Sequence, residues 1–430
     1  LNLLSNEQDI ELVQQDIRIA KSNYLPSVNA SLSGTYVDPK LAEESFGQNP
    51  EFSTSGTISV DQLVFSQEVK TNINIQEQLL KAQEQNYSTS QLDLIFDVTN
   101  AYLTALILKA NAQIQIRNLD LTKRNLQISE QNFAAGQSGK SDVLRFQSEI
   151  AQNTQSLVEA LNQLEQGFIN LNQLLNNPVE MEIDVEDVTL NTELFERYNY
   201  DELTRLLDDP KLREPFMQFL IEEAFRNAPE LKELAFNLQA NQASIHLYDR
   251  GRYYPTVSLQ GQYNRIFNRN GAGSETTIPN GNYNVGVNVS LPLYNQNLNN
   301  INEQIARVQK HQLNINQKDI KLAISANIRN NVFNLVNQIS NIELSEVSER
   351  TAGESLELTQ TAYSSGAVNI IQLIDAQNNF LNAQLSRTNA FYNFLIDALA
   401  LERTMGYFFL LHTDDENEAF RQRFLNFTQE

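Results

Sequence analysis

The sequence contains one unusual pattern twice, and this duplication limits what the chain can fold into more than any other feature. Tyr24-Leu25-Pro26-Ser27-Val28 reappears as Tyr253-Tyr254-Pro255-Thr256-Val257, at an offset of 229 residues. Phe133-Ala134-Ala135-Gly136 matches Tyr363-Ser364-Ser365-Gly366 at an offset of 230. Solenoid repeats have periods of roughly 20 to 50 residues. Each half of this chain must therefore be a complete structural unit.

Each half opens with a pair of alternating segments that predicts a β-hairpin. In the first half, residues 25–37 and 53–65 alternate apolar side chains with Ser, Asn and Thr. Residues 255–267 and 283–293 repeat this alternation in the second half. Successive side chains of a strand point to opposite faces of the sheet. We therefore expect four strands, each with one apolar face and one small polar face.

A stretch almost free of Gly and Pro follows each hairpin and predicts very long helices. Residues 66–135 contain neither residue type, and residues 295–365 contain only Gly353. Apolar residues recur at heptad spacing, as in the line Ile73, Leu80, Tyr87, Leu94, Ala101 and Leu108. This spacing is typical of coiled coils, and 70 helical residues would span about 105 Å. We expect each helix to turn back at Gly136 or Gly366, because Gly favours the left-handed cap that ends a helix.

Composition excludes several classes of protein. The 430 residues are 41% hydrophobic, which predicts a folded chain. No apolar run approaches the roughly 18 to 20 residues of a membrane-spanning helix, so any contact with a membrane must come from the strands. The net charge of −22 argues against nucleic acid and anionic membrane surfaces as partners. The chain has no cysteine, which excludes disulfides and thiolate metal sites.

Two segments lie outside the duplicated pattern. Residues 179–211 are strongly acidic and are expected to form an irregular, solvated linker between the halves. Leu1 corresponds to Glu230 of the second half, where a predicted helix over 216–229 comes first. The first half lacks a counterpart of that helix, and no signal peptide is visible. We therefore expect the natural chain to begin upstream of Leu1.

The sequence contains no pattern that predicts an enzyme. His246, His311 and His412 are isolated, and none has the spacing of a zinc site. Gly271-Ala272-Gly273 falls in a predicted hairpin loop rather than at the start of a helix. The many Asn and Gln residues along the helices suit a face wetted by water. We expect no catalytic residue, no cofactor and no bound metal.

Four strands cannot close a barrel, and this decides what the strands can do in a membrane. Open edges in lipid would leave backbone groups unpaired, at several kcal/mol each. Two chains would give eight strands, a barrel filled by its own side chains, whereas three would give twelve strands and a lumen. The small polar set favours a wet lumen. The alternative is a soluble coiled-coil scaffold protein with β-hairpin appendages, which would purify without detergent.

Over nearly its whole length the chain resembles the TolC-like outer-membrane efflux channels. The resemblance rests on the tandem halves, on the Tyr-x-Pro-x-Val strand entry, and on the strand pairs before long helices. It also rests on two helix-turn motifs, Phe133-x-x-Gly136-x5-Asp142-Val143-Leu144 and Tyr363-x-x-Gly366-x5-Gln372-Leu373-Ile374-Asp375-Ala376-Gln377. It implies a homotrimer in the outer membrane of a Gram-negative bacterium. Three chains would form a 12-stranded transmembrane β-barrel that continues into a mainly α-helical coiled-coil tunnel through the periplasm.

The resemblance also implies a passive exit duct of a tripartite efflux or type I secretion system. Its partners would be outer-membrane lipid, a periplasmic adaptor (membrane fusion) protein and an inner-membrane transporter. Drug, metal and protein export all fit this interpretation. No enzyme activity is implied.

We expect four parts along the chain. They are a first repeat over 1–178, an acidic equatorial linker over 179–211, a second repeat over 212–407, and a C-terminal equatorial segment over 408–430. Within the repeats we expect β-hairpins over 25–65 and 255–293 and long helices over 66–176 and 295–406.

Three residues are candidates for the periplasmic entrance. In the TolC-like family, rings of acidic side chains narrow this mouth near the second helix turn. Asp375 matches one ring position, whereas Gln372 stands where well-known members carry a second Asp. Asp142 is the counterpart of Gln372 in the first half. Alternatively, Asp142 interacts with the dipole of its own helix, and Asp375 lies on a solvated helix face.

The two helix turns are candidates for docking the adaptor, because they end the longest helices. Small residues beside Gly136 and Gly366 would allow a partner backbone to approach closely. Phe133 and Tyr363 either anchor the coiled coil or also contact the partner. Two similar turns in each chain would give six sites in a trimer.

Overall fold

The computed structural model describes residues 1–186, 207, 209–274 and 279–427, which form two compact units. One unit contains the strands and comprises Asn2–Tyr87 and Glu230–Lys318. The other is helical and comprises Leu1, Ser88–Pro229 and Asp319–Glu430. Each unit therefore takes segments from both halves of the sequence.

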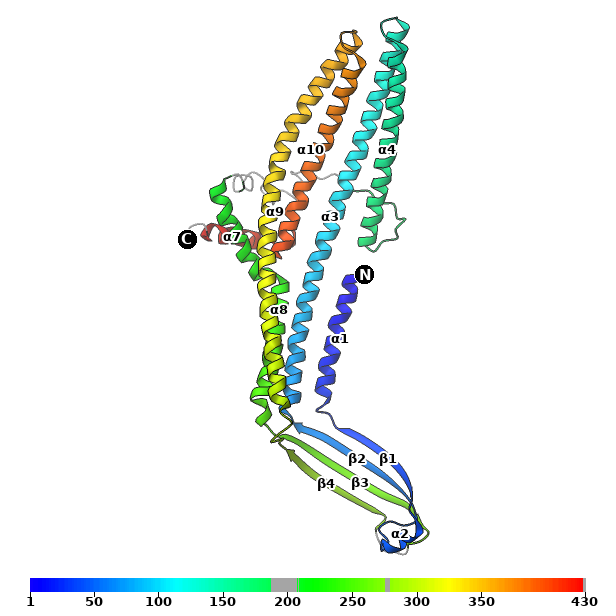
Figure 1. Ribbon diagram of the computed structural model, residues 1–430, viewed down its shortest axis with the longest axis vertical. Coiled ribbons are helices and arrows are strands. Elements are labelled where there is room, and N and C mark those ends of the chain that lie inside the picture. Colours follow the sequence, from blue (N-terminus) through cyan, green and yellow to red (C-terminus); the bar gives the residue numbers. More distant parts are fainter. Residues whose placement is uncertain (187–206, 208, 275–278, 428–430) are drawn as a thin grey trace. The chain divides into compact units, whose positions relative to one another are not determined.

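The element order repeats in the two halves (Figure 1). The first half contains α1 (Asn2–Ser22), β1 (Ser27–Tyr36), α2 (Pro39–Glu44), β2 (Phe52–Phe65), α3 (Gln67–Ala134) and α4 (Lys140–Leu174). The second contains α7 (Pro210–Asn227), α8 (Pro229–Asp249), η1 (Gly251–Tyr253), β3 (Thr256–Asn270), β4 (Gly281–Ser290), α9 (Leu298–Ser364), α10 (Ile370–Met405), η2 (Phe409–Leu411) and α11 (Asp414–Phe427).

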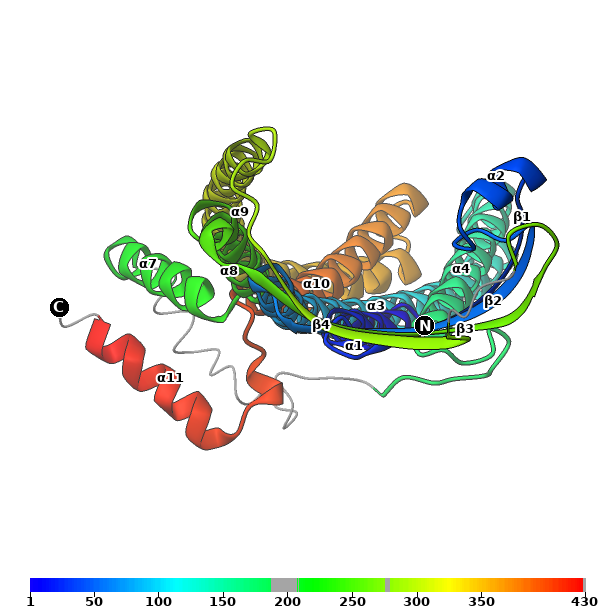
Figure 2. The same ribbon diagram turned by 90° about the horizontal axis from the view of Figure 1, so that it is seen from below.

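The four strands form one curved antiparallel sheet in the order β1-β2-β3-β4 (Figures 1 and 2). Val28 pairs with Val60, Ile58 with Tyr263, and Leu259 with Val287. Residues directly opposite each other point to the same face, so these pairs place the apolar side chains together. Pairs such as Ser31 with Thr57 and Gln262 with Asn284 form the other face. The sheet thus has the apolar face and the polar face that the alternation predicts.

The last strand is shorter than its sequence pattern suggests. β4 ends at Ser290, so the expectation of a strand to residue 293 is wrong there. Pro292 lacks the N–H that a paired strand needs. Gln296 and Asn297 then have left-handed φ values of 50° and 63°, and α9 begins at Leu298 rather than at residue 295. These residues turn the chain from the sheet into the helix.

Two further segments differ from expectation. The first hairpin loop contains a short helix, α2, whose start is capped by the Asp38 carboxylate accepting N–H bonds from Lys40 and Leu41. Helix α7 begins at Pro210, inside the expected linker, and continues through Pro215, which removes one helical hydrogen bond without ending the helix. Most of that linker, residues 187–206 and 208, lies outside the described residues.

Near the C-terminus, α7 and α11 pack together through aromatic rings and one ion pair. Phe216 meets Phe424 edge to face at 5.3 Å between ring centroids, and Phe219 meets Phe420 at 5.2 Å. The guanidinium of Arg423 donates to the buried carboxylate of Glu223 at 2.8 Å. The charge of Glu223 is therefore paired, as a buried carboxylate requires.

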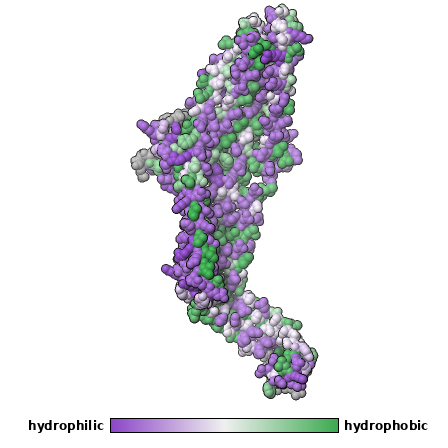
Figure 3. Space-filling model, viewed as in Figure 1, coloured by the Kyte–Doolittle hydropathy of each residue, from purple (hydrophilic) through white to green (hydrophobic). Residues whose placement is uncertain are grey.

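The long helices expose many apolar side chains. Among the described helices, only α3 contains a window apolar enough by length and composition to cross a membrane, with a mean hydropathy of 1.2. The core helix of a bundle has the same property, so this is a weak signal. The first turns of α9 carry the exposed row Ile301, Ile305, Val308 and Ile315, and apolar patches are visible along this part of the surface (Figure 3). Spacings of 4, 3 and 7 residues place these side chains on one face of the helix.

A buried cluster joins the two helical hairpins close to their turns. Phe146 of α4 and Tyr363 of α9 pack edge to face at 6.1 Å, and both are buried. Leu356, Ile370, Leu373 and Ile374 complete the cluster. The side chain of Phe133, the counterpart of Tyr363 in the first half, is 45% exposed, whereas that of Tyr363 is 3% exposed. Tyr363 therefore anchors the coiled coil, and Phe133 does so much less.

This difference predicts unequal effects of two matched substitutions. Tyr363→Ala opens a cavity beside Phe146 and should lower the free energy of unfolding by about 3 to 5 kcal/mol. Phe133→Ala removes a half-exposed ring and should lower it by less than half as much. Urea unfolding of the two variants in detergent, followed by helical circular dichroism, measures both effects. Equal losses would contradict the assignment of Tyr363 as the anchor.

Candidate channel entrance and docking turns

The two helix turns have the same backbone geometry. Gly136 and Gly366 have left-handed φ values of 72° and 76°. The N–H of Gly136 donates to the carbonyl of Phe133 at 3.0 Å, and Gly366 donates to Tyr363 at 3.0 Å. A Cβ at either glycine would meet no atom within 4 Å. The need for glycine thus comes from the backbone conformation and not from lack of space.

Both turns present small side chains to solvent. Ala134 and Ala135 are exposed in the first turn, as are Ser364 and Ser365 in the second. The hydroxyls of the two serines donate to carbonyls of their own helix, to Thr361 at 2.8 Å and to Ala362 at 2.9 Å. The hydroxyls of these two serines are therefore satisfied within their own helix end.

Asp142 lies beside the buried ring of Tyr363. Burial raises the pKa of the Tyr363 phenol, and the negative charge of Asp142 raises this pKa further. Asp142 itself stands in the first turn of α4, with its N–H donating to the carbonyl of Gly139 at 3.0 Å. A carboxylate at this position stabilises the helix through its dipole. The structural role that the sequence left open for Asp142 is therefore compatible with its position.

The other two entrance candidates, Gln372 and Asp375, differ in whether their side chains are hydrogen-bonded within the chain. Gln372 forms a capping box with Asn369: the Gln372 N–H donates to Asn369 Oδ1 at 3.1 Å, and the Asn369 N–H donates to Gln372 Oε1 at 3.2 Å. Asp375 is exposed and has no hydrogen bond or ion pair with any residue that the structure describes. The side chain of Gln372 therefore stabilises the start of α10. The Asn-x-x-Gln spacing in the sequence is a signal for this role. The Asp375 carboxylate remains available.

A buried network of amides joins α10 to α3 above the turns. The Gln377 amide donates to Asn118 Oδ1 at 2.8 Å and to Thr122 Oγ1 at 2.6 Å. Its carbonyl oxygen accepts from Asn125 Nδ2 at 3.0 Å. All four side chains are buried. Buried polar side chains in a coiled coil fix the register of its helices, because a shifted register would leave them unpaired.

The same network reaches the other two long helices. Asn153 of α4 donates to Thr122 at 2.8 Å, and Gln360 of α9 donates to Asn125 at 2.9 Å. One connected set of side chains therefore links α3, α4, α9 and α10. The expectation that the helical amides lie on wetted faces is wrong for the buried amides of this network.

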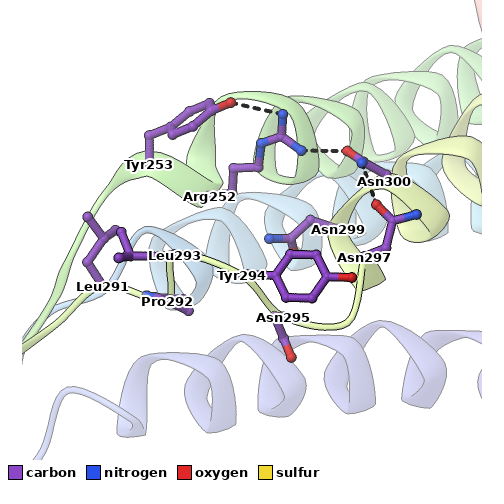
Figure 4. A pocket seen from close by; sticks show the side chains of 10 residues that line it. All are labelled: Arg252, Tyr253, Leu291, Pro292, Leu293, Tyr294, Asn295, Asn297, Asn299 and Asn300. Atoms are coloured by element: carbon purple, nitrogen blue, oxygen red, sulfur yellow. Dashed lines mark hydrogen bonds between the residues drawn. The ribbon is translucent and has the colours of Figure 1, made fainter.

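A separate open pocket of about 320 Å³ lies where β4 leads into α9 (Figure 4). Arg252 lines this pocket, and its guanidinium donates to the Asn300 side-chain oxygen at 2.5 Å and to the Tyr253 hydroxyl at 2.9 Å. Its lining is otherwise built from Leu, Pro, Tyr and Asn residues. In the part of the chain that is described, no three His, Cys, Asp or Glu side chains gather as a metal site.

Comparison with known proteins agrees with this architecture. The model of the family described as "Outer membrane efflux protein" matches residues 1–177 and 220–407. The chain is 23% identical over 417 residues to the outer membrane protein TolC of Escherichia coli K12, covering 94% of this chain and 79% of the relative. It is 22% identical over 400 residues to the pyoverdine export outer membrane protein OpmQ of Pseudomonas aeruginosa, covering 89% and 78%.

Solved structures show the same fold. The outer membrane protein VceC of Vibrio cholerae superposes with a TM-score of 0.75 at 16% identity, covering 94% of this chain and 93% of that chain. The outer-membrane channel OprN superposes with a TM-score of 0.74 at 17% identity, covering 95% and 87%. The family match extends over both hairpins and all four long helices, and the chain therefore belongs to the outer membrane efflux protein family.

Proposed function

We propose that three copies of this outer-membrane efflux protein form one continuous export duct, with β1–β4 of each copy contributing a third of a transmembrane barrel. The observation that carries the proposal is the four-stranded sheet with one apolar face and two outer strands that, among the described residues, each pair on one side only. In lipid, the free edges of β1 and β4 would leave N–H and C=O groups unpaired. Pairing β4 of one copy with β1 of the next satisfies them and closes twelve strands.

The chemistry of the two faces supports a barrel with a wet interior. The exposed apolar face includes Leu32, Val285, Val287 and Val289. The opposite face carries Ser, Asn, Thr and Gln, and the Ser33 and Ser55 hydroxyls share a hydrogen bond at 3.0 Å. An apolar exterior against lipid and a polar interior against water is the pattern of membrane barrels. A soluble scaffold would not need a broad apolar face on an otherwise uncovered sheet.

At the opposite end of the long helices, Asp375 and Asp142 form the entrance. Three copies of the unpaired Asp375 carboxylate converge on the axis, and Asp142 in the first turn of α4 adds to their negative charge. Like charges in a narrow mouth with protein walls concentrate their field and attract cations. Gln372 adds no charge, so the entrance carries one strong ring rather than two.

The entrance assignment predicts a change in ion selectivity. The double variant Asp142→Asn/Asp375→Asn should reduce cation preference and weaken block by multivalent cations in single-channel recordings, with Asp375→Asn giving most of the effect. Asp414→Asn, which removes a charge from α11, serves as the control and should leave both properties unchanged. Unaltered selectivity and block in the double variant would remove these aspartates from the entrance.

The two helix turns dock the periplasmic adaptor, which connects the duct to an inner-membrane transporter. They end the hairpins, their small side chains are exposed, and the hydroxyls of Ser364 and Ser365 are satisfied within the second turn. A helical tip of a partner can therefore approach the backbone closely without leaving a buried polar group unpaired. Six such turns in the trimer match a ring of adaptor tips.

Bulky side chains on the turns should block this docking. Ala135 and Ser365 are better targets than the glycines, because a side chain at positive φ would strain the turn itself. Ala135→Trp/Ser365→Trp should abolish pump-dependent export and co-purification with the adaptor, while trimers still reach the outer membrane. Ala135→Ser/Ser365→Ala is the matched control and should export normally. If the Trp variant exports as well as this control, the turns are not the docking surface.

A further inference from the structure

One charged side chain lies on the otherwise apolar face of the sheet. Arg265 of β3 is paired with Gly56 of β2 on one side and with Gly281 of β4 on the other. Every second residue of a strand points to the same face, so Arg265 shares its face with Leu259 and Tyr263. A cation therefore lies on the face that the barrel would turn toward lipid.

The other charged side chains of the four described strands lie on the opposite face. Asp61 pairs with Ser27, and Arg269 pairs with Ser53, in the rows of small polar residues. Arg265 is exposed and has no hydrogen bond, ion pair or ring contact with any residue that the structure describes. The net charge of −22 repels anions from the chain as a whole, but no described strand carries a carboxylate on the apolar face.

Arg265 lies near the end of the strands that the hairpin loops connect. Its partner Gly281 is the first residue of β4, and β3 ends at Asn270. The strands lead into the long helices at their other end, and in an outer membrane efflux protein these helices lie on the periplasmic side. The loop end, with Arg265, therefore faces the outside of the cell.

Three exposed aromatic side chains lie around this position: Tyr263, Phe267 and Tyr283. A Cβ at Gly56 would lie 2.8 Å from the ring of Phe267, and a Cβ at Gly281 would lie 3.1 Å from the hydroxyl of Tyr263. The two rings thus cover the glycines on either side of Arg265. Girdles of aromatic residues mark the boundaries of the apolar band of a membrane barrel, which places Arg265 at the level of the outer-leaflet headgroups.

The first half of the chain shows what the same position looks like without a cation. At the offset of 229 residues, Arg265 and Gly281 correspond to Tyr36 and Phe52. These two residues are also directly paired, and their rings pack at 4.9 Å between centroids. The second half replaces this aromatic pair by a guanidinium and a residue without a side chain. The Tyr263 hydroxyl, which has no hydrogen bond to a described residue, lies over that glycine as a second donor.

We propose that Arg265 and Tyr263 bind the phosphate group of an outer-leaflet lipid. This inference rests on the barrel proposed above, because it requires the apolar face of the sheet to meet lipid. A guanidinium matches two phosphate oxygens with parallel N–H bonds, and the phenol hydroxyl adds a further donor. The exposed side chains of Val285, Val287 and Val289 continue from this site toward the helical end and contact the acyl chains. Because β3 already pairs on both sides within the chain, pairing between copies leaves the site uncovered.

The test measures lipid binding to the purified trimer in detergent by native mass spectrometry. The probe is an acylated glucosamine disaccharide that carries phosphates, and the same lipid without phosphates is the comparison. Arg265→Gln should weaken binding of the phosphorylated lipid roughly tenfold, to the level of the phosphate-free lipid, because it removes charge-assisted hydrogen bonds. Arg265→Tyr introduces the side chain of the first half and should lose binding to the same extent.

Arg269→Gln is the matched control, because it removes the same charge from the same strand on the opposite face. It should bind the phosphorylated lipid as the unmodified channel does. If Arg265→Gln trimers bind this lipid as tightly as Arg269→Gln trimers, the guanidinium only reaches into water, and the lipid site is overturned while the trimeric barrel stands. Inorganic phosphate that displaces the lipid at equal concentration would show an anion site without a role for acyl chains, and it would overturn the proposal as well.

Two other results would contradict the barrel on which this inference rests. Loss of lipid binding in Arg269→Gln but not in Arg265→Gln would place the polar face of the sheet against lipid. A sample without trimers would contradict the assembly itself.

Discussion

The pairing of backbone groups at the edges of the sheet is the constraint on which the rest of this structure depends. Water can satisfy an open strand edge, but hydrocarbon cannot. The sheet has an apolar face that belongs in lipid, and yet β1 and β4 each pair with a single neighbour among the described strands. We therefore propose that the chain is one sector of a larger assembly. Its exposed row of apolar side chains on α9 and its two similar turns fit that role.

Duplication followed by divergence would let one chain supply two different sectors of the proposed assembly. The halves share their order of elements and the geometry of their turns. They differ where each half has a different neighbour. Tyr363 is buried against Phe146, whereas Phe133 is half exposed, and Gln377 is enclosed by α3, whereas Gln147 is exposed. On the proposed assembly, these differences mark contacts that are made within the chain and contacts that are made between copies.

The sequence predicted the elements whose pattern extends over many residues. Period-two alternation located all four strands, and the near-absence of Gly and Pro located both long helices to within a few residues. The ends of elements and the roles of single side chains were predicted less well. The end of β4 depends on Pro292 and on two residues with positive φ, and the role of Gln372 depends on a capping box with Asn369. The burial of Asn125 and Gln377 depends on which helices meet, which no single-segment pattern contains.

The central claim is that β4 of one copy pairs with β1 of the next, and amide hydrogen exchange tests it most directly. In a closed barrel, the N–H groups of β1 and β4 are all bonded to a neighbouring strand. The assembled channel in detergent should therefore protect the amides of β1 and β4 as strongly as those of β2 and β3. If alternate amides of β1 and β4 exchange at the rate of open edges while β2 and β3 stay protected, the barrel is not closed by neighbouring copies.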